Sequence, residues 1–234
     1  MRKTIIRLSL FVLVALMASQ GLTQEKTIIA GFASFPVGDF GSTDLDKGGF
    51  AETGWGIALD SRMSGKKWPQ GLEVYFHSTY QWNKMNTEAV SQAYTDTIGL
   101  RTVVSGSRYS PIIATLGPSY YYAINDKIEI GMYSGVGVLF NNTKAFSIKV
   151  YDDMGVNVLN EVVNFDNRPA FAYLFGIDID FEVLEDILKI GLFADYSSAK
   201  QKTELSFSSA EPADTFQKLQ YLNAGIKFIF IKRN

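Results

Sequence analysis

Apolar and polar residues alternate with a period of two along much of the chain. In residues 168–183, Phe171, Phe175 and Ile179 lie on one face, and Asp178 and Asp180 lie on the other. Successive side chains of a β-strand point to opposite faces, so this pattern predicts strands with one apolar face. The predicted strands are residues 26–35, 52–60, 71–82, 112–122, 127–140, 168–183, 188–196 and 222–230.

The links between these strands alternate between short and long. The short links are residues 61–70, 125–126 and 184–187. The long links are residues 37–49, 83–110, 141–167 and 197–216. In an up-and-down arrangement this order places all short turns and both termini at one end, as in outer-membrane barrels. We therefore predict an all-β fold, an eight-stranded antiparallel up-and-down transmembrane β-barrel.

The N-terminus has the order of a secretory signal. Arg2, Lys3 and Arg7 precede an apolar run over residues 8–17, which small and polar residues follow. That run is shorter than the roughly 20 residues of a spanning helix. We predict a signal peptide over residues 1–23, cleaved between Gly21 and Gln24, and a barrel over residues 24–234; the alternative is an amphipathic N-terminal helix.

Composition narrows the function classes. The chain has no cysteine, which excludes a disulfide framework and thiolate metal sites. Its formal net charge of −2 gives no basic patch of the kind that nucleic acid requires. We expect no nucleic-acid partner, no cofactor and no metal.

Alternation alone also fits a soluble eight-stranded barrel with an inward apolar face. Three features favour lipid: the small residues beside the charges on the polar face, the regular order of the links, and aromatic residues near strand ends. Such aromatic residues are typical of membrane interfaces. The predicted membrane-interface aromatics are Tyr80, Trp82, Tyr120, Tyr122, Tyr173, Tyr196, Phe228 and Phe230.

Together, the signal, the strands, the link order and the aromatic last strand (residues 221–230) resemble the small bacterial outer-membrane barrels of OmpA, OmpX and OmpW type. The resemblance covers the mature chain and implies a location in the bacterial outer membrane. Members of this family usually end on an aromatic residue, whereas here residues 231–234 follow Phe230.

The polar face carries a set of charges that would point into the barrel. The predicted lumenal charge network is Glu52, Asp60, Glu73, His77, Lys127, Glu129, Asp178, Asp180, Lys189, Asp195 and Lys227. An eight-stranded lumen is only wide enough for side chains to fill, so a plug of paired charges is expected. The alternative is a narrow path for ions or protons. Small residues such as Gly131 and Gly135 leave room for lumenal side chains such as Tyr133.

The third long link contains two strand-like segments, residues 145–151 and 156–163, around the turn signal of residues 152–155. We predict a hairpin above the membrane that can contact a partner; the alternative is a flexible loop.

For function, the leading hypothesis is a monomeric, non-enzymatic outer-membrane protein with a role in envelope structure or in surface interaction. Its partners are then outer-membrane lipid and a protein at the long loops. The second hypothesis is porin-like transport of small solutes or binding of a hydrophobic ligand. The third is a lipid-modifying enzyme that uses His77, although no catalytic motif is matched.

Overall fold

Eight antiparallel strands close into a barrel in the computed structural model, which describes residues 24–46, 48–65 and 68–233. The barrel strands are β1 (Gln24–Pro36), β2 (Gly54–Ser64), β3 (Leu72–Lys84), β6 (Ile112–Asn125), β7 (Ile128–Phe140), β10 (Ala170–Leu184), β11 (Leu188–Ser206) and β12 (Ala213–Arg233). Each pairs with the next in this order, and β1 pairs with β12 from Gln24↔Arg233 to Pro36↔Tyr221. The predicted fold class is confirmed, and no barrel strand is left with an open edge in lipid.

The barrel carries a band of apolar side chains on the outside, while a smaller set that includes Ile28, Phe32 and Ile229 packs inside. On β10, Phe171 is 66% exposed and Ile177 is 54% exposed, whereas Ala172 and Asp178 are buried inside. A soluble barrel would have the opposite arrangement, because water surrounds it. The outward apolar band therefore requires lipid around the strands.

The predicted signal peptide, residues 1–23, lies outside the described residues, so its cleavage stays a prediction. Among the residues that the structure does describe, no helix is long and apolar enough to cross a membrane.

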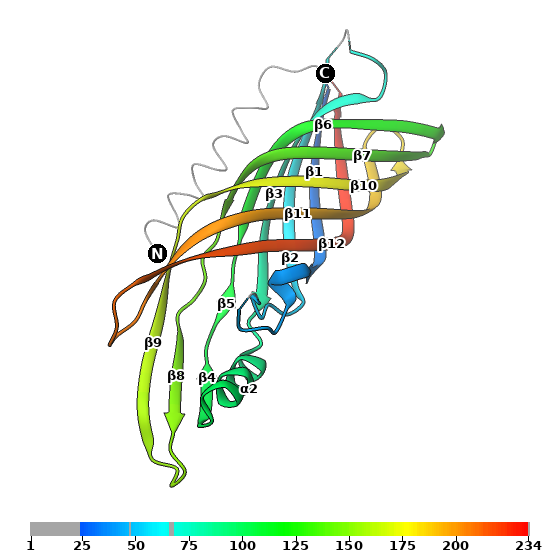
Figure 1. The fold of residues 1–234 in the computed structure, drawn as a ribbon. Coiled ribbons are helices and arrows are strands. Elements are labelled where there is room, and N and C mark those ends of the chain that lie inside the picture. Colours follow the sequence, from blue (N-terminus) through cyan, green and yellow to red (C-terminus); the bar gives the residue numbers. More distant parts are fainter. Residues whose placement is uncertain (1–23, 47, 66–67, 234) are drawn as a thin grey trace.

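The long links build a second region that extends beyond one end of the barrel (Figure 1). Its elements are η1 (Gly38–Gly41), α2 (Thr87–Ile98), β4 (Arg101–Ser105), β5 (Arg108–Tyr109), β8 (Phe146–Tyr151) and β9 (Asn157–Asn167). β9 pairs with the end of β11, β8 with β9, and β4 with β8, so one sheet continues from the barrel wall. We call these elements, together with residues 42–53 and 200–217, the external assembly.

The predicted hairpin in the third link is confirmed as β8 and β9. Its turn is held by Asp152, whose Oδ1 accepts hydrogen bonds from the N–H groups of Met154 at 3.0 Å and Val156 at 2.8 Å. Gly155 adopts φ +75°, a conformation that glycine allows without steric cost.

The predicted link over residues 197–216 is wrong. β11 continues to Ser206, and β12 starts at Ala213, so the connection is only residues 207–212. The strands continue because the backbone ladder does, while their side chains lose the apolar stripe once they leave the lipid. A prediction based on that stripe ends each strand too early.

Helix α2 was also missed within the link of residues 83–110. Asn86 caps it by accepting a hydrogen bond from the N–H of Ala89 at 2.9 Å, and Gly99 ends it at φ 71°. The hydroxyls of Ser91 and Thr95 accept the N–H groups of Val104 and Thr102, respectively. The helix therefore covers the outer edge of β4.

Candidate functional site

The centre of the lumen holds a cluster of four charged side chains. Arg62 on β2 donates to Asp178 at 2.9 Å and to Asp180 at 3.1 Å, both on β10. Lys227 on β12 pairs with Asp178 and lies 2.8 Å from Asp180. Tyr121 donates to Asp178 at 2.9 Å, and the Arg62 guanidinium lies 4.0 Å from the centre of the Tyr121 ring. Two cations thus balance two carboxylates in a site that is almost completely buried.

A second group surrounds the single histidine of the chain. His77 Nδ1 lies 2.8 Å from Asp60 Oδ1, and Tyr75 donates to Asp60 Oδ2 at 2.7 Å. Nearby, Asn223 donates to Asp195 at 2.9 Å. These side chains fill the lumen between the central cluster and the external end with hydrogen-bonded polar groups.

Two more ion pairs lie toward the end with the short turns. Lys26 contacts Glu73 at 2.7 Å, and Lys189 contacts Glu129 at 2.7 Å. Glu129 remains partly exposed there, with 24% of its side chain accessible.

Two of the predicted lumenal charges lie elsewhere. Glu52 is exposed in the segment before β2, and Lys127 is exposed in the turn between β6 and β7. Both lie beyond the ends of their strands, where alternation no longer assigns a side chain to a face.

Glycines make room for the lumenal rings, although not at every predicted position. An added Cβ at Gly176 would lie 2.3 Å from the ring of Tyr133, and one at Gly131 would lie 2.1 Å from the ring of Tyr121. The glycine that accommodates Tyr133 is therefore on the neighbouring strand β10.

The predicted interface aromatics all lie on the outer side of the barrel in two groups. Those toward the external end are Tyr80, Trp82, Tyr173 and Tyr196. Those toward the short-turn end are Tyr120, Tyr122, Phe228 and Phe230. This separation along the barrel is the one expected of two interfacial girdles.

Beyond the lumenal charges, a layer of apolar side chains joins inward polar residues such as Ser197 and Gln201. Phe40, Ile113, Leu139, Leu219 and Tyr221 are each at most 2% exposed and belong to one cluster. Phe40 packs edge-on against Tyr221, with their ring centroids 5.1 Å apart. This apolar layer lies between the lumenal charges and the outer elements of the external assembly.

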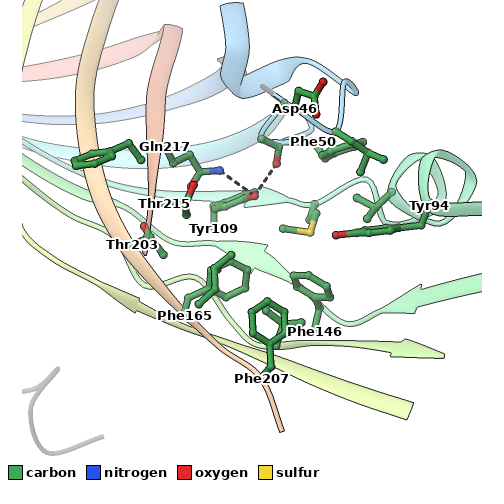
Figure 2. Close-up of a pocket in the computed structure, with 18 residues that line it drawn as sticks. Asp46, Phe50, Tyr94, Tyr109, Phe146, Phe165, Thr203, Phe207, Thr215 and Gln217 are labelled. Carbon is green, nitrogen blue, oxygen red and sulfur yellow. Dashed lines mark hydrogen bonds between the residues drawn. The ribbon is translucent and has the colours of Figure 1, made fainter. Parts of the chain in front are cut away.

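A pocket of about 220 Å³ lies within the external assembly (Figure 2). Every long link contributes to it, through side chains that include Phe50, Tyr94, Phe165 and Phe207 (Figure 2). Phe146 and Phe165 form part of its wall, with ring centroids 5.6 Å apart. We call this cavity the external pocket.

One side of the external pocket is polar. Tyr109 donates to the Gly49 carbonyl at 2.6 Å and accepts from Gln217 Nε2 at 3.3 Å (Figure 2). Burial raises the pKa of the Tyr109 hydroxyl above its ordinary value, so it remains a neutral donor. Thr203, Thr215 and the acidic Asp46 also line the pocket.

No protein-family model and no curated protein matches the sequence. Solved structures do match: the outer membrane protein OprG from Pseudomonas aeruginosa gives a TM-score of 0.51 at 14% identity, over 92% of this chain and 99% of that chain. The outer membrane protein AlkL in lipid bilayers gives 0.49 at 13% identity, over 92% and 94%. Neisserial surface protein A gives 0.47 at 6% identity, over 88% and 96%.

The fold is that of a small bacterial outer-membrane β-barrel. With the outward apolar band, this fold places the chain in the bacterial outer membrane. The short turns of this outer-membrane barrel then face the periplasm, and the external assembly faces outside the cell.

Sequence reasoning found Lys227 but missed Arg62, the other cation at the centre of the lumen. Arg62 was assigned to the short link after residue 60, but the alternation continues through Asp60, Arg62 and Ser64 on β2. The period-two spacing of these polar residues was the sequence signal that Arg62 points into the lumen. The external pocket left no such signal, because its residues come from four separate links of the barrel.

Proposed function

We propose that this outer-membrane barrel is a non-enzymatic protein whose external loops bind a small apolar molecule in the external pocket. The pocket carries the proposal, because it is lined mainly by aromatic and aliphatic side chains with polar groups on one side. Ligand sites in proteins share this composition. The volume of about 220 Å³ is below the usual ~300 Å³ or more of pockets for drug-sized molecules, which favours a short ligand with one polar end.

The filled lumen supports binding rather than open diffusion through the barrel. A solute that entered from outside would meet the apolar layer of Phe40 and Tyr221 and then the charges around Arg62. Separating these buried ion pairs without replacement partners is costly. We expect planar-bilayer recordings to show no steady conductance, and stable single-channel currents would contradict this part of the proposal.

The environment of His77 supports a non-enzymatic role. His77 is 2% exposed, and its Nδ1 contacts the Asp60 carboxylate deep in the lumen. A general base must reach its substrate, and an apolar layer lies between His77 and the external pocket. Unchanged lipid profiles in cells with His77→Gln are the expected result.

Ligand binding can be tested with normal alcohols of increasing chain length, titrated into the detergent-solubilised protein by calorimetry. We expect an affinity optimum at short or medium chains and a loss of binding in Val163→Trp. Val163 is buried and lines the pocket, so the added ring fills it.

The matched control is Val162→Trp, because Val162 is the next residue on β9 and is 42% exposed. It should bind like the wild type. Leu205→Trp provides a second block from β11, in case the substitution at Val163 disturbs the hairpin. Equal binding by all four proteins would contradict the pocket proposal.

A protein partner at the hairpin is the second candidate function. Met154 at its tip is 85% exposed, and Val156 and Val158 are each more than half exposed. Exposed apolar side chains of this kind mark contact surfaces. A photo-crosslinker at Val158 on intact cells should give one discrete protein adduct. One at Asn125, the last residue of β6 at the periplasmic end, should not give the same adduct.

A further inference from the structure

The lipid-facing stripe of β3 changes character toward the external end. Apart from the buried Ser78, its even-numbered residues run from Val74 and Phe76 to Tyr80 and Trp82, and then to the exposed Lys84. Residues two apart on a strand are about 6–7 Å apart along its axis. Lys84 therefore lies directly above the aromatic girdle, at the level where lipid headgroups begin.

Arg108 lies beside Lys84 on the same face. The two residues are register partners across β3 and β5, and both are exposed. Like charges directly opposite each other destabilise a strand pair. Within residues 24–46, 48–65 and 68–233, no carboxylate forms an ion pair with either cation. An anion between them would offset this repulsion.

A half-open hollow of about 470 Å³ lies at this position. It is lined by residues 52–55 before and at the start of β2, by residues 82–84 of β3, and by Arg108. Trp55 and Trp82 stack with ring centroids 4.1 Å apart, and Trp55 is 57% exposed on the lipid side. The two tryptophan rings therefore line the hollow on the lipid side, and the two cations line it toward the external end.

Glu52 is the one acidic residue that lines the hollow. Its N–H donates to the Lys84 carbonyl at 2.8 Å, which fixes its backbone. With Lys84 and Arg108, the lining carries two positive charges and one negative charge. The excess favours an anionic group.

We propose that this hollow binds the phosphate-bearing headgroup of a lipid in the external leaflet, with the lipid chain against Trp55 and Trp82. Arg108 can donate two parallel hydrogen bonds to a phosphate, and Lys84 adds a mobile cation. Basic residues at membrane depth recognise anionic headgroups in this way. The site is separate from the external pocket and does not depend on the function proposed for it.

The proposal can be tested by native mass spectrometry of the full protein in detergent with dihexanoyl phosphatidic acid. Dihexanoyl phosphatidylcholine serves as the lipid control, because it has the same chains but a zwitterionic headgroup. We expect the wild type to prefer phosphatidic acid and the double variant Lys84→Gln, Arg108→Gln to bind it at least about tenfold more weakly.

The matched control is Lys149→Gln, Arg101→Gln, which removes one lysine and one arginine from β8 and β4 in the external assembly. It should bind phosphatidic acid like the wild type. Equal binding by both double variants and the wild type would overturn the proposal.

A further arm separates a lipid from a soluble phosphate anion. Replacing Trp55 and Trp82 by alanine should weaken the binding of phosphatidic acid. Inorganic phosphate at the same concentration should not displace phosphatidic acid from the wild type. If inorganic phosphate displaces the lipid and the tryptophan variant binds normally, the site recognises free phosphate and the lipid proposal fails.

Fluorescence gives an independent readout. The chain has three tryptophans, so Trp68→Phe leaves only the two that line the hollow. Phosphatidic acid should then shift the emission, and the Lys84→Gln, Arg108→Gln substitutions in that background should remove the shift. An unshifted emission in the Trp68→Phe protein would contradict the proposed site.

Discussion

The centre of the lumen and the interior of the external assembly are filled by different kinds of side chain. Inside the barrel, Arg62 and Asp178 are buried among polar partners, whereas inside the external assembly Phe50 and Val90 are buried among apolar ones. The surrounding medium explains the difference. Lipid accepts apolar side chains on the outside of the barrel. Outside the membrane, water surrounds the chain and drives apolar side chains into the interior.

The change occurs within single strands. On β12, Lys227 and Asn223 point into the lumen, and Tyr221 and Leu219 continue the same inward face as apolar residues. Strand geometry stays constant along this face, while the chemistry of its side chains changes. The position of the change therefore marks where the external assembly begins to close over the lumen.

The largest effect is expected from Arg62→Met, which leaves Lys227 as the one described cation paired with Asp178 and Asp180. Removing one partner from a buried ion cluster costs about 3–5 kcal/mol, because an uncompensated charge stays buried. Urea unfolding of the barrel in lipid vesicles would measure this loss. It tests whether the polar interior depends on balanced charge.

Arg62→Lys is the control, because it keeps the charge and loses only the forked geometry. Its loss should be the smaller of the two. A change below ~1 kcal/mol in Arg62→Met, typical of exposed ion pairs, would mean that the lumen is wet enough to solvate the carboxylates.

Packing in the lumen predicts a smaller effect. Gly176→Ala places a Cβ 2.3 Å from the Tyr133 ring, and such overpacking costs about 1–3 kcal/mol. The same urea measurement applies. Gly31→Ala on β1 is the control, since nothing lies within 4 Å of its added Cβ. Equal stability of the two variants would show that the lumen is loosely packed.

The strands within lipid could be predicted from the sequence because lipid imposes a period-two pattern on them. Phe171 to Val183 on β10 shows that pattern without interruption, and all barrel strands were found. The predicted strand ends were wrong where the strands leave the lipid and the period-two pattern stops, as at Lys202 and Glu204 on β11. Backbone pairing continues there with polar residues on both faces.

The external pocket could not be predicted, because no local pattern encodes which links meet. Phe50, Tyr94, Phe165 and Phe216 come from four segments that converge only in the folded barrel. Helix α2 was within reach of the sequence, since Asn86 and Gly99 are ordinary cap residues at its two ends.

The smallest expected effect is on the local stability of the loop between β11 and β12, which the Glu161 carboxylate holds. Glu161 on β9 accepts hydrogen bonds from the Ser209 hydroxyl at 2.8 Å, the Ser209 N–H at 3.0 Å and the Ser208 N–H. These bonds, with the Ser209 hydroxyl first, lower the pKa of the Glu161 carboxyl. A lowered pKa stabilises the folded loop at neutral pH, and this contribution disappears as the pH falls below ~4.3 toward the lowered value.

Amide hydrogen exchange at Ser208 and Ser209 should therefore accelerate at acidic pH relative to the intrinsic rate, while the barrel amides stay protected. In the Glu161→Gln variant, the Ser208 and Ser209 amides should exchange quickly already at neutral pH, and their exchange should no longer depend on this carboxyl group. The reason is that an amide is a weaker acceptor than a carboxylate. Protection that is independent of pH in the wild type would show that this connection is held by its apolar contacts alone. Apolar contacts would then stabilise residues 207–212 as they stabilise the rest of the external assembly, in contrast to the ion pairs of the lumen.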